Sequence, residues 1–95
     1  MLKKLQELHE KLEETREEIR KSLNAGDKKA AMLHGMEAEK LEAEMLLIVS
    51  GRVRRKVAKL LQLRFIDGLG PSQIQFILGV SHTTYYRLLK EAERS

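Results

Sequence analysis

Four short breaks, each containing glycine, interrupt a chain that otherwise consists of helix-forming residues, at residues 24–27, 50–51, 67–70 and 79–81. No stretch shows the sustained period-two alternation of a strand, and Pro71 is the only proline. Between the breaks, apolar residues recur every three or four positions, which is the spacing of one helix face. We therefore expect an all-α protein with five helices, at about residues 2–23, 28–49, 52–66, 71–78 and 82–94.

The first two expected helices are amphipathic and joined by a short link. The first carries a coiled-coil-like apolar stripe, interrupted by His9, Thr15 and Arg16 and formed by Leu2, Leu5, Leu8, Leu12, Ile19 and Leu23. The second carries an inner face of Ala31, His34, Ala38, Leu41, Met45 and Ile48. The link predicts an antiparallel hairpin, or arms that pair in a dimer. Residues 45–49 are apolar on nearly all sides, so we expect other residues to cover them.

The net charge changes sign at Ser50-Gly51, which we interpret as the boundary between a helical arm, residues 1–50, and a domain, residues 52–95. A continuous helix through Gly51, at a cost of about 1 kcal/mol for the glycine, is the alternative. The arm holds nine basic and eleven acidic residues, whereas residues 51–95 hold nine basic and three acidic, a net charge of +6. A basic domain has the electrostatic footprint of a nucleic-acid binder. Arg54 and Arg55, at the start of the third helix, are candidates for phosphate contact, although a solvated basic face is the simpler interpretation.

Residues 70–82 carry the signals of two short helices joined by a tight turn. Gly70 can stand at an N-cap, and proline at position 71 suits the first position of a helix because its missing N–H would have no partner there. Gly79 can end that helix, and the Ser81 hydroxyl can cap the next. Two helices with a three-residue, glycine-containing turn form a helix-turn-helix pattern, whose second helix enters the DNA major groove.

The spacing of the last helix separates a core face from an exposed face. Tyr85, Leu88 or Leu89, and Ala92 should face the core, which leaves outside His82, Thr83, Thr84, Tyr86, Arg87 and Lys90. Threonine and arginine can contact base edges, so the best candidates for base readout are Thr83, Thr84 and Arg87. Phosphate candidates are Lys90, at the far end of this helix, and Ser72 and Gln73, whose free backbone N–H groups open the preceding helix. Ser81 completes the expected DNA-binding set.

Residues 60–93 resemble the C-terminal helix-turn-helix of sigma factors, the module that reads the promoter −35 element. They are more similar still to small phage-encoded regulators of the ArpU and RinA type. The matching segments are Leu63-Arg64-Phe65, Asp67-Gly68, Ile74, Leu78-Gly79-Val80-Ser81 and Tyr86-Arg87. This resemblance, over about the last third of the chain, implies sequence-specific binding of double-stranded DNA in transcription control, usually of late phage genes.

Three residues of the first helix of the pair depart from that pattern. Such modules have a small residue after the isoleucine, where this chain has Gln75, and polar residues at the positions of Phe76 and Ile77. A longer side chain at position 75 implies a wider helix crossing. Two interpretations of Phe76 and Ile77 are open. They pack under the arm, or they mark a protein contact, such as a second subunit or RNA polymerase.

Several function classes are not supported by the composition. The chain has no cysteine, and His9, His34 and His82 lie far apart without the spacing of metal ligands. No catalytic constellation, phosphate-binding loop or membrane-spanning apolar run occurs, so we expect no enzyme, no cofactor, no metal and no membrane partner. A cytoplasmic protein, associated with the nucleoid of a bacterial host, is the expected location.

The sequence therefore predicts an N-terminal helical hairpin followed by a three-helix helix-turn-helix domain. The function we expect is a phage- or prophage-encoded transcription regulator that dimerises through residues 1–50. The alternative is a DNA-recognition and packaging subunit, like a small terminase, that forms a higher oligomer. Small terminases usually place the DNA-binding module first, and this chain has the reverse order. A helical adaptor that binds only protein is a third interpretation.

Overall fold

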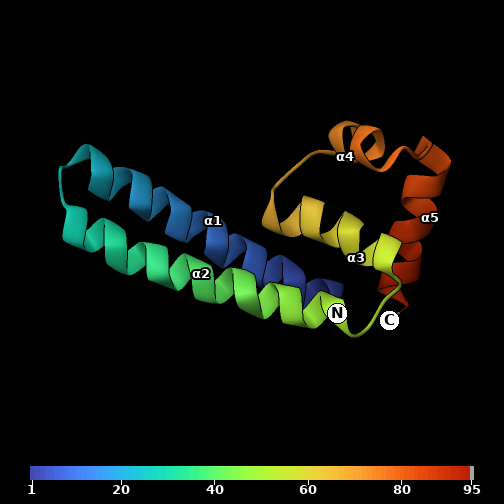
Figure 1. The fold of residues 1–95 in the computed structure, drawn as a ribbon, viewed down its shortest axis with the longest axis horizontal. Helices are drawn as coiled ribbons and strands as arrows, with labels where there is room; N and C mark the ends of the chain where they lie inside the picture. Colours follow the sequence, from blue (N-terminus) through green and yellow to red (C-terminus); the bar gives the residue numbers. More distant parts are fainter. Residues whose placement is uncertain (95) are drawn as a thin grey trace.

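The computed structural model describes residues 1–94 and contains five α-helices, with a π-helical segment directly after the third. The elements are α1 (Leu2–Asn24), α2 (Lys28–Ser50), α3 (Arg55–Leu61), the π-helical η1 (Gln62–Ile66), α4 (Pro71–Leu78) and α5 (His82–Glu93). No strand occurs among the described residues. The all-α prediction is confirmed. Figure 1 shows that α1 and α2 form one long layer and that α3, α4 and α5 gather over one end of it.

The hairpin of α1 and α2 is confirmed and closes as the local residues predict. Gly26 has φ +74°, a left-handed conformation that glycine adopts without strain. Asp27 caps α2 by accepting a hydrogen bond from the backbone N–H of Ala30 at 3.0 Å. The two helices run antiparallel along their whole length, and the turn between them projects away from the other helices (Figure 1).

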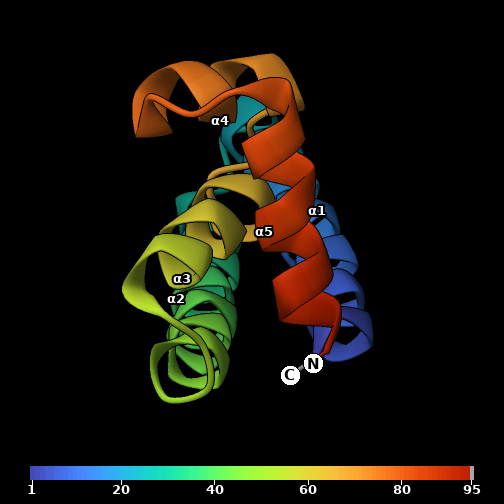
Figure 2. The same ribbon diagram turned by 90° about the vertical axis from the view of Figure 1, so that its right-hand side faces the viewer.

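A single hydrophobic core joins the hairpin to the C-terminal helices. Leu5 and Leu12 of α1, Met45 of α2, Leu60 of α3 and Tyr85 of α5 are all fully buried in it. Burying a leucine side chain contributes roughly 1.5–3 kcal/mol, so the leucines of the arm add to the stability of the C-terminal helices. Helix α5 packs against α3, and α3 in turn lies over α2 (Figure 2).

The third expected helix differs from the prediction at both ends. The break after Ser50 is confirmed, but α3 begins at Arg55 and not at residue 52, because Arg54 is extended, with ψ 154°. Its last five residues, Gln62–Ile66, form a π-helical turn, in which the Asp67 N–H donates to the Gln62 carbonyl at 3.1 Å. The wider turn rotates the side chains that follow relative to a regular α-helix.

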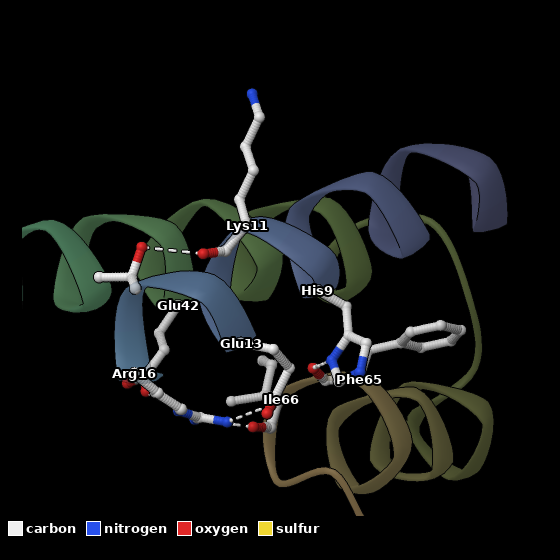
Figure 3. Close-up of polar contacts among 8 residues, drawn as sticks. His9, Lys11, Glu13, Arg16, Glu42, Phe65 and Ile66 are labelled. Carbon is white, nitrogen blue, oxygen red and sulfur yellow. Dashed lines mark hydrogen bonds and ion pairs between the residues drawn. The ribbon is translucent and has the colours of Figure 1, made fainter. Parts of the chain in front are cut away.

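Two polar residues that interrupt the α1 stripe bind the end of η1. His9 Nδ1 lies 2.7 Å from the Phe65 carbonyl oxygen, and since a carbonyl only accepts, Nδ1–H is the donor. Arg16 donates to the Ile66 carbonyl at 2.9 Å and to the Glu42 carboxylate at 3.1 Å. Figure 3 shows both side chains reaching from α1 to these carbonyls. The interruptions of the stripe are therefore the contacts that dock the arm on η1.

The third interruption has a different role. Thr15 is buried, and its hydroxyl donates to the Lys11 carbonyl one turn earlier at 2.8 Å. The hydroxyl thus has its hydrogen-bond partner within α1, as is common for threonine in a helix. The methyl group of Thr15 is then free to pack in the apolar interior.

The structure decides between the two interpretations of Phe76 and Ile77. Phe76 is 89% exposed and Ile77 is 52% exposed, so they do not pack under the arm. Leu46 and Leu47 are 42% and 76% exposed, so the cover expected for residues 45–49 does not come from residues 1–94. In both cases the helix places its other side against the core, and the apolar residues that remain face outward.

We expect Arg16→Ala to lower the free energy of unfolding by about 1–2 kcal/mol, because it leaves the Ile66 carbonyl without its donor. Urea unfolding followed by circular dichroism measures this loss. Arg20→Ala is the matched control, since Arg20 is exposed and pairs with Glu17 on its own helix, and it should change stability by less than about 0.5 kcal/mol. Equal losses in the two variants would contradict the docking role of Arg16.

Candidate nucleic-acid interface

The turn between α4 and α5 has the geometry that the sequence predicts. Gly79 ends α4 in the left-handed conformation, φ +66°, and its N–H reaches the Phe76 carbonyl at 3.3 Å. The Val80 N–H bonds the Gln75 carbonyl at 3.1 Å, which completes the closing motif. An L side chain is strained at this φ, so glycine is the residue that permits a turn of three residues here.

Both helices of the pair begin with a side-chain cap. At α4, Gly70 is extended, Pro71 follows at the first helical position, and Gln73 Oε1 accepts from the Gly70 N–H at 3.1 Å. At α5, the Ser81 hydroxyl accepts from the Thr84 N–H at 3.2 Å and donates to the Thr84 hydroxyl at 3.0 Å. These local bonds set where each helix starts, and hence which α5 residues face outward.

The inner face of α5 is held by the core and by one long-range hydrogen bond. Tyr85, Leu88 and Ala92 are buried, as their spacing predicts. The Tyr85 hydroxyl accepts from Arg64 of η1 at 2.9 Å, so the buried phenol is satisfied. The Arg64 guanidinium also lies over the Phe65 ring, 5.5 Å from its centroid. Because Tyr85 is fully buried, these contacts fix the rotation of α5 about its own axis.

An ion pair holds the other end of α5. Arg54 Nε lies 2.7 Å from one oxygen of Glu91 and its NH2 group lies 2.9 Å from the other, a bidentate pair. The hydrogen bonds from Arg54 hold the pKa of Glu91 below its ordinary value, and those same bonds raise the pKa of Arg54. The pair joins the segment before α3 to the last turns of α5.

Five of the predicted DNA-binding residues share one exposed surface of α5, here called the recognition face. His82, Thr83, Tyr86, Arg87 and Lys90 line a shallow hollow of about 410 Å³. The His82 and Tyr86 rings meet edge to face, with centroids 4.7 Å apart. The lining holds two cations and no carboxylate, and it offers hydroxyl, phenol and imidazole groups beside them. Such a surface can donate hydrogen bonds and attract an anion.

The other predicted residues lie outside the recognition face. Ser81 and Thr84 form the cap of α5 and bond each other. Ser72 and Gln73 line a separate hollow on α4, beside Phe76 and Ile77.

The two arginines predicted to contact phosphate are also elsewhere. Arg54 is bound to Glu91, and Arg55 lines a groove between α2 and α3. The sequence reasoning missed Arg64 and Glu91 as residues that position α5. Their partners are 21 and 37 residues away, a separation at which helical spacing carries no signal.

These features define a class, an all-α protein whose last two helices form a helix-turn-helix with an exposed, basic recognition face. A family model described as "Protein of unknown function (DUF1492)" matches residues 2–95, and the chain belongs to this family. No curated protein and no solved structure matches the chain significantly.

Two further findings bear on other kinds of site. Within residues 1–94, no group of three or more His, Asp or Glu side chains is placed to hold a metal ion. None of the described helices is both long and apolar enough to cross a membrane.

We expect the Glu91 carboxyl to titrate below its ordinary pKa in the wild-type protein and to return toward that value in Arg54→Ala. Since the folded-state pKa is lowered, the pair stabilises the protein above the ordinary pKa. That contribution is lost as the pH falls through the lowered pKa. Carbon-detected NMR titration measures the shift, and Arg52→Ala is the control for loss of a nearby positive charge. An unchanged Glu91 pKa in Arg54→Ala would show that the pair does not persist in solution.

Proposed function

We propose that this protein is a sequence-specific double-stranded DNA-binding transcription regulator, phage- or prophage-encoded, that acts as a dimer on two half-sites. The observation that carries the proposal is the recognition face of α5, which directly follows the turn of a helix-turn-helix pair. In such pairs the N-terminal residues of the second helix contact base edges. The resemblance to sigma-factor and ArpU- or RinA-type modules supports the same function.

In this proposal, residues in the first two turns of α5 contact the bases. Thr83 is exposed and its hydroxyl and methyl groups can contact a base edge or a thymine methyl. Arg87 is exposed one turn later and can bind guanine through two hydrogen bonds. Thr84 is half-buried and its hydroxyl accepts from Ser81, so its contribution is chiefly to the cap. Tyr86 and His82, in contact with each other, form the wall of the face beside these two residues.

In this proposal, Lys90 and the first residues of α4 contact the phosphates. Lys90 lines the same hollow as Arg87 but lies at its far end, where the backbone of a bound duplex would pass. The backbone N–H groups of Ser72 and Gln73 open α4, where the helix dipole attracts an anion. Arg54 serves better as the residue that holds α5 through Glu91 than as a direct phosphate ligand.

A DNA-recognition and packaging subunit is the second candidate function. It shares the recognition face, and the exposed apolar residues of α2 favour an oligomer in either case. The number of subunits separates the two functions, because a regulator reading two half-sites needs a dimer, whereas a packaging subunit forms a ring. Neither function requires a catalytic group or a cofactor.

Fluorescence anisotropy on random duplex DNA, titrated across salt, tests the shared property. A logarithm of the binding constant that falls linearly with the logarithm of the salt concentration would establish that phosphate contacts release counterions. Selection of preferred sites from genomic fragments then tests sequence specificity. Negligible binding at low salt would overturn both functions and leave a protein-binding adaptor as the explanation of the exposed Phe76 and Ile77.

Arg87→Ala and Lys90→Ala should have different signatures on the selected site. Arg87→Ala should lose about 1–3 kcal/mol of binding free energy and relax specificity at one base pair. Lys90→Ala should weaken all sequences alike and reduce the salt slope by about 1. Lys11→Ala is the control, because Lys11 is an exposed residue of α1 outside the recognition face, and it should change neither quantity. Identical specificity profiles for the wild type and Arg87→Ala would remove Arg87 from base readout.

A further inference from the structure

Helix α2 is apolar on two opposite sides. Its inner side packs against α1 and the core through Ala31, Ala38, Met45 and Val49. Its other side, here called the outer face of α2, is exposed and carries Met32, Leu33, Met36, Leu46 and Leu47. A run of large exposed apolar side chains along one helix marks an interaction surface, because contact between a large apolar patch and water is unfavourable and soluble monomers rarely have one.

The outer face matches itself when two copies of α2 are placed antiparallel, face to face. Turning the helix end for end about the midpoint between Glu39 and Lys40 exchanges Met32 with Leu47 and Leu33 with Leu46. The same operation exchanges Met36 with Ala43 and Glu39 with Lys40. Each apolar residue thus meets an apolar residue, and each of the two central charges meets its opposite. The midpoint lies at the centre of α2, Lys28–Ser50, so two copies would overlap along their whole length.

We propose that the outer face of α2 binds the same face of a second copy of this chain, with the two helices antiparallel and centred between Glu39 and Lys40. The proposal rests on the dimer of the proposed function and names the surface and register through which that dimer forms. A two-fold interface uses one patch on both subunits, which is the property that this face has.

The central charges favour the antiparallel arrangement over a parallel one. Glu39 and Lys40 are exposed, and neither forms an ion pair with another side chain among residues 1–94. In the antiparallel arrangement two Glu39–Lys40 pairs form across the interface. A parallel pair in register would instead place Glu39 beside Glu39 and Lys40 beside Lys40, which is unfavourable.

A groove beside the outer face has room for side chains of the second copy. It lies between α2 and α3, has a volume of about 970 Å³, and is lined by residues that include Leu46, Leu47, Lys56 and Lys59. Met32 and Leu33 of the second copy would lie opposite Leu47 and Leu46 in the proposed register. The groove is therefore continuous with the helix face and is filled by the same partner.

The proposed register also spaces the two DNA-binding modules. Each module is attached at the C-terminal end of its α2, and the two ends would lie about 32 Å apart along the helix pair, given a rise of about 1.5 Å per residue. Successive major grooves on one side of a duplex are separated by about 34–36 Å. The attachment points of the two modules are therefore about as far apart as two half-sites one helical turn apart.

Sedimentation equilibrium of the DNA-free protein tests the interface independently of DNA binding. We expect a dimer for the wild type, and Met36→Glu and Leu47→Glu should raise the dimer dissociation constant by at least about tenfold, since each places a charge in an apolar interface. The far-ultraviolet circular dichroism spectrum should not change, because both residues are exposed. Phe76→Glu is the matched control, an exposed apolar residue outside the face, and should leave the dimer intact.

A charge-reversal cycle tests the register. Glu39→Lys and Lys40→Glu should each weaken the dimer, and the double variant Glu39→Lys/Lys40→Glu should restore it, because both cross-pairs are again opposite in sign. A double variant as weak as the singles would overturn the antiparallel register.

Engineered cysteines give a direct geometric readout, since the chain has none of its own. A mixture of Met32→Cys and Leu47→Cys proteins should form an oxidised heterodimer, whereas each alone should not cross-link efficiently. Efficient cross-linking of Met32→Cys with itself would indicate a parallel pair and overturn the proposal.

The oligomeric state separates this proposal from the proposed function. A monomer at every concentration, or a ring of many subunits, overturns the two-fold interface, and the ring favours the packaging function. A dimer that obeys the charge-reversal cycle but has no DNA affinity confirms the interface and overturns the regulator.

Discussion

The fold depends on hydrogen bonds from the arm to the last carbonyl groups of η1. A π-helical turn that stops at Ile66 leaves its last carbonyl groups without partners in the helix, and an unsatisfied buried carbonyl costs about 1–3 kcal/mol. His9 and Arg16 of α1 supply the donors, from 56 and 50 residues away. The same helix buries Leu5, Leu8 and Leu12 in the common core. Polar and apolar contacts thus make the arm part of the folding unit that carries α5.

That docking also determines what α5 can present to a ligand. Because η1 is held by α1, the neighbouring Arg64 is placed to bond the Tyr85 hydroxyl inside the core. Tyr85 in turn fixes the rotation of α5, so Arg87 and Thr83 are left on the outside. The recognition face is therefore positioned by a chain of contacts that begins in the arm. A substitution in the arm can therefore alter the proposed DNA contacts even though the substituted residue does not itself contact DNA.

The part of this structure that could be predicted from the sequence is the part set by local signals. Proline at position 71, glycine at 79 and serine at 81 act on their own neighbours, so α4 and the start of α5 lie where they were expected. The π-helical turn and the Arg54–Glu91 pair depend on residues distant in the chain, and helical spacing contains no information about them. Spacing likewise identifies the apolar sides of a helix but not which side is covered. For that reason the sequence left two interpretations of Phe76 open, and it did not reveal that Leu47 is exposed within one chain.

The two-sided character of α2 follows from the shape of the molecule. The described chain extends over 45 × 25 × 17 Å, and the hairpin tip projects beyond the helices that form the core (Figure 1). A chain of this size buries a limited fraction of its surface, so an elongated monomer gains stability by association. The inner side of α2 is used by α1, and only the outer side remains to supply that gain. Because its residues are symmetric on reversal about Glu39 and Lys40, a second copy in the proposed register would cover it. Dimerisation through α2 would leave α5 free, since the recognition face belongs to a different helix.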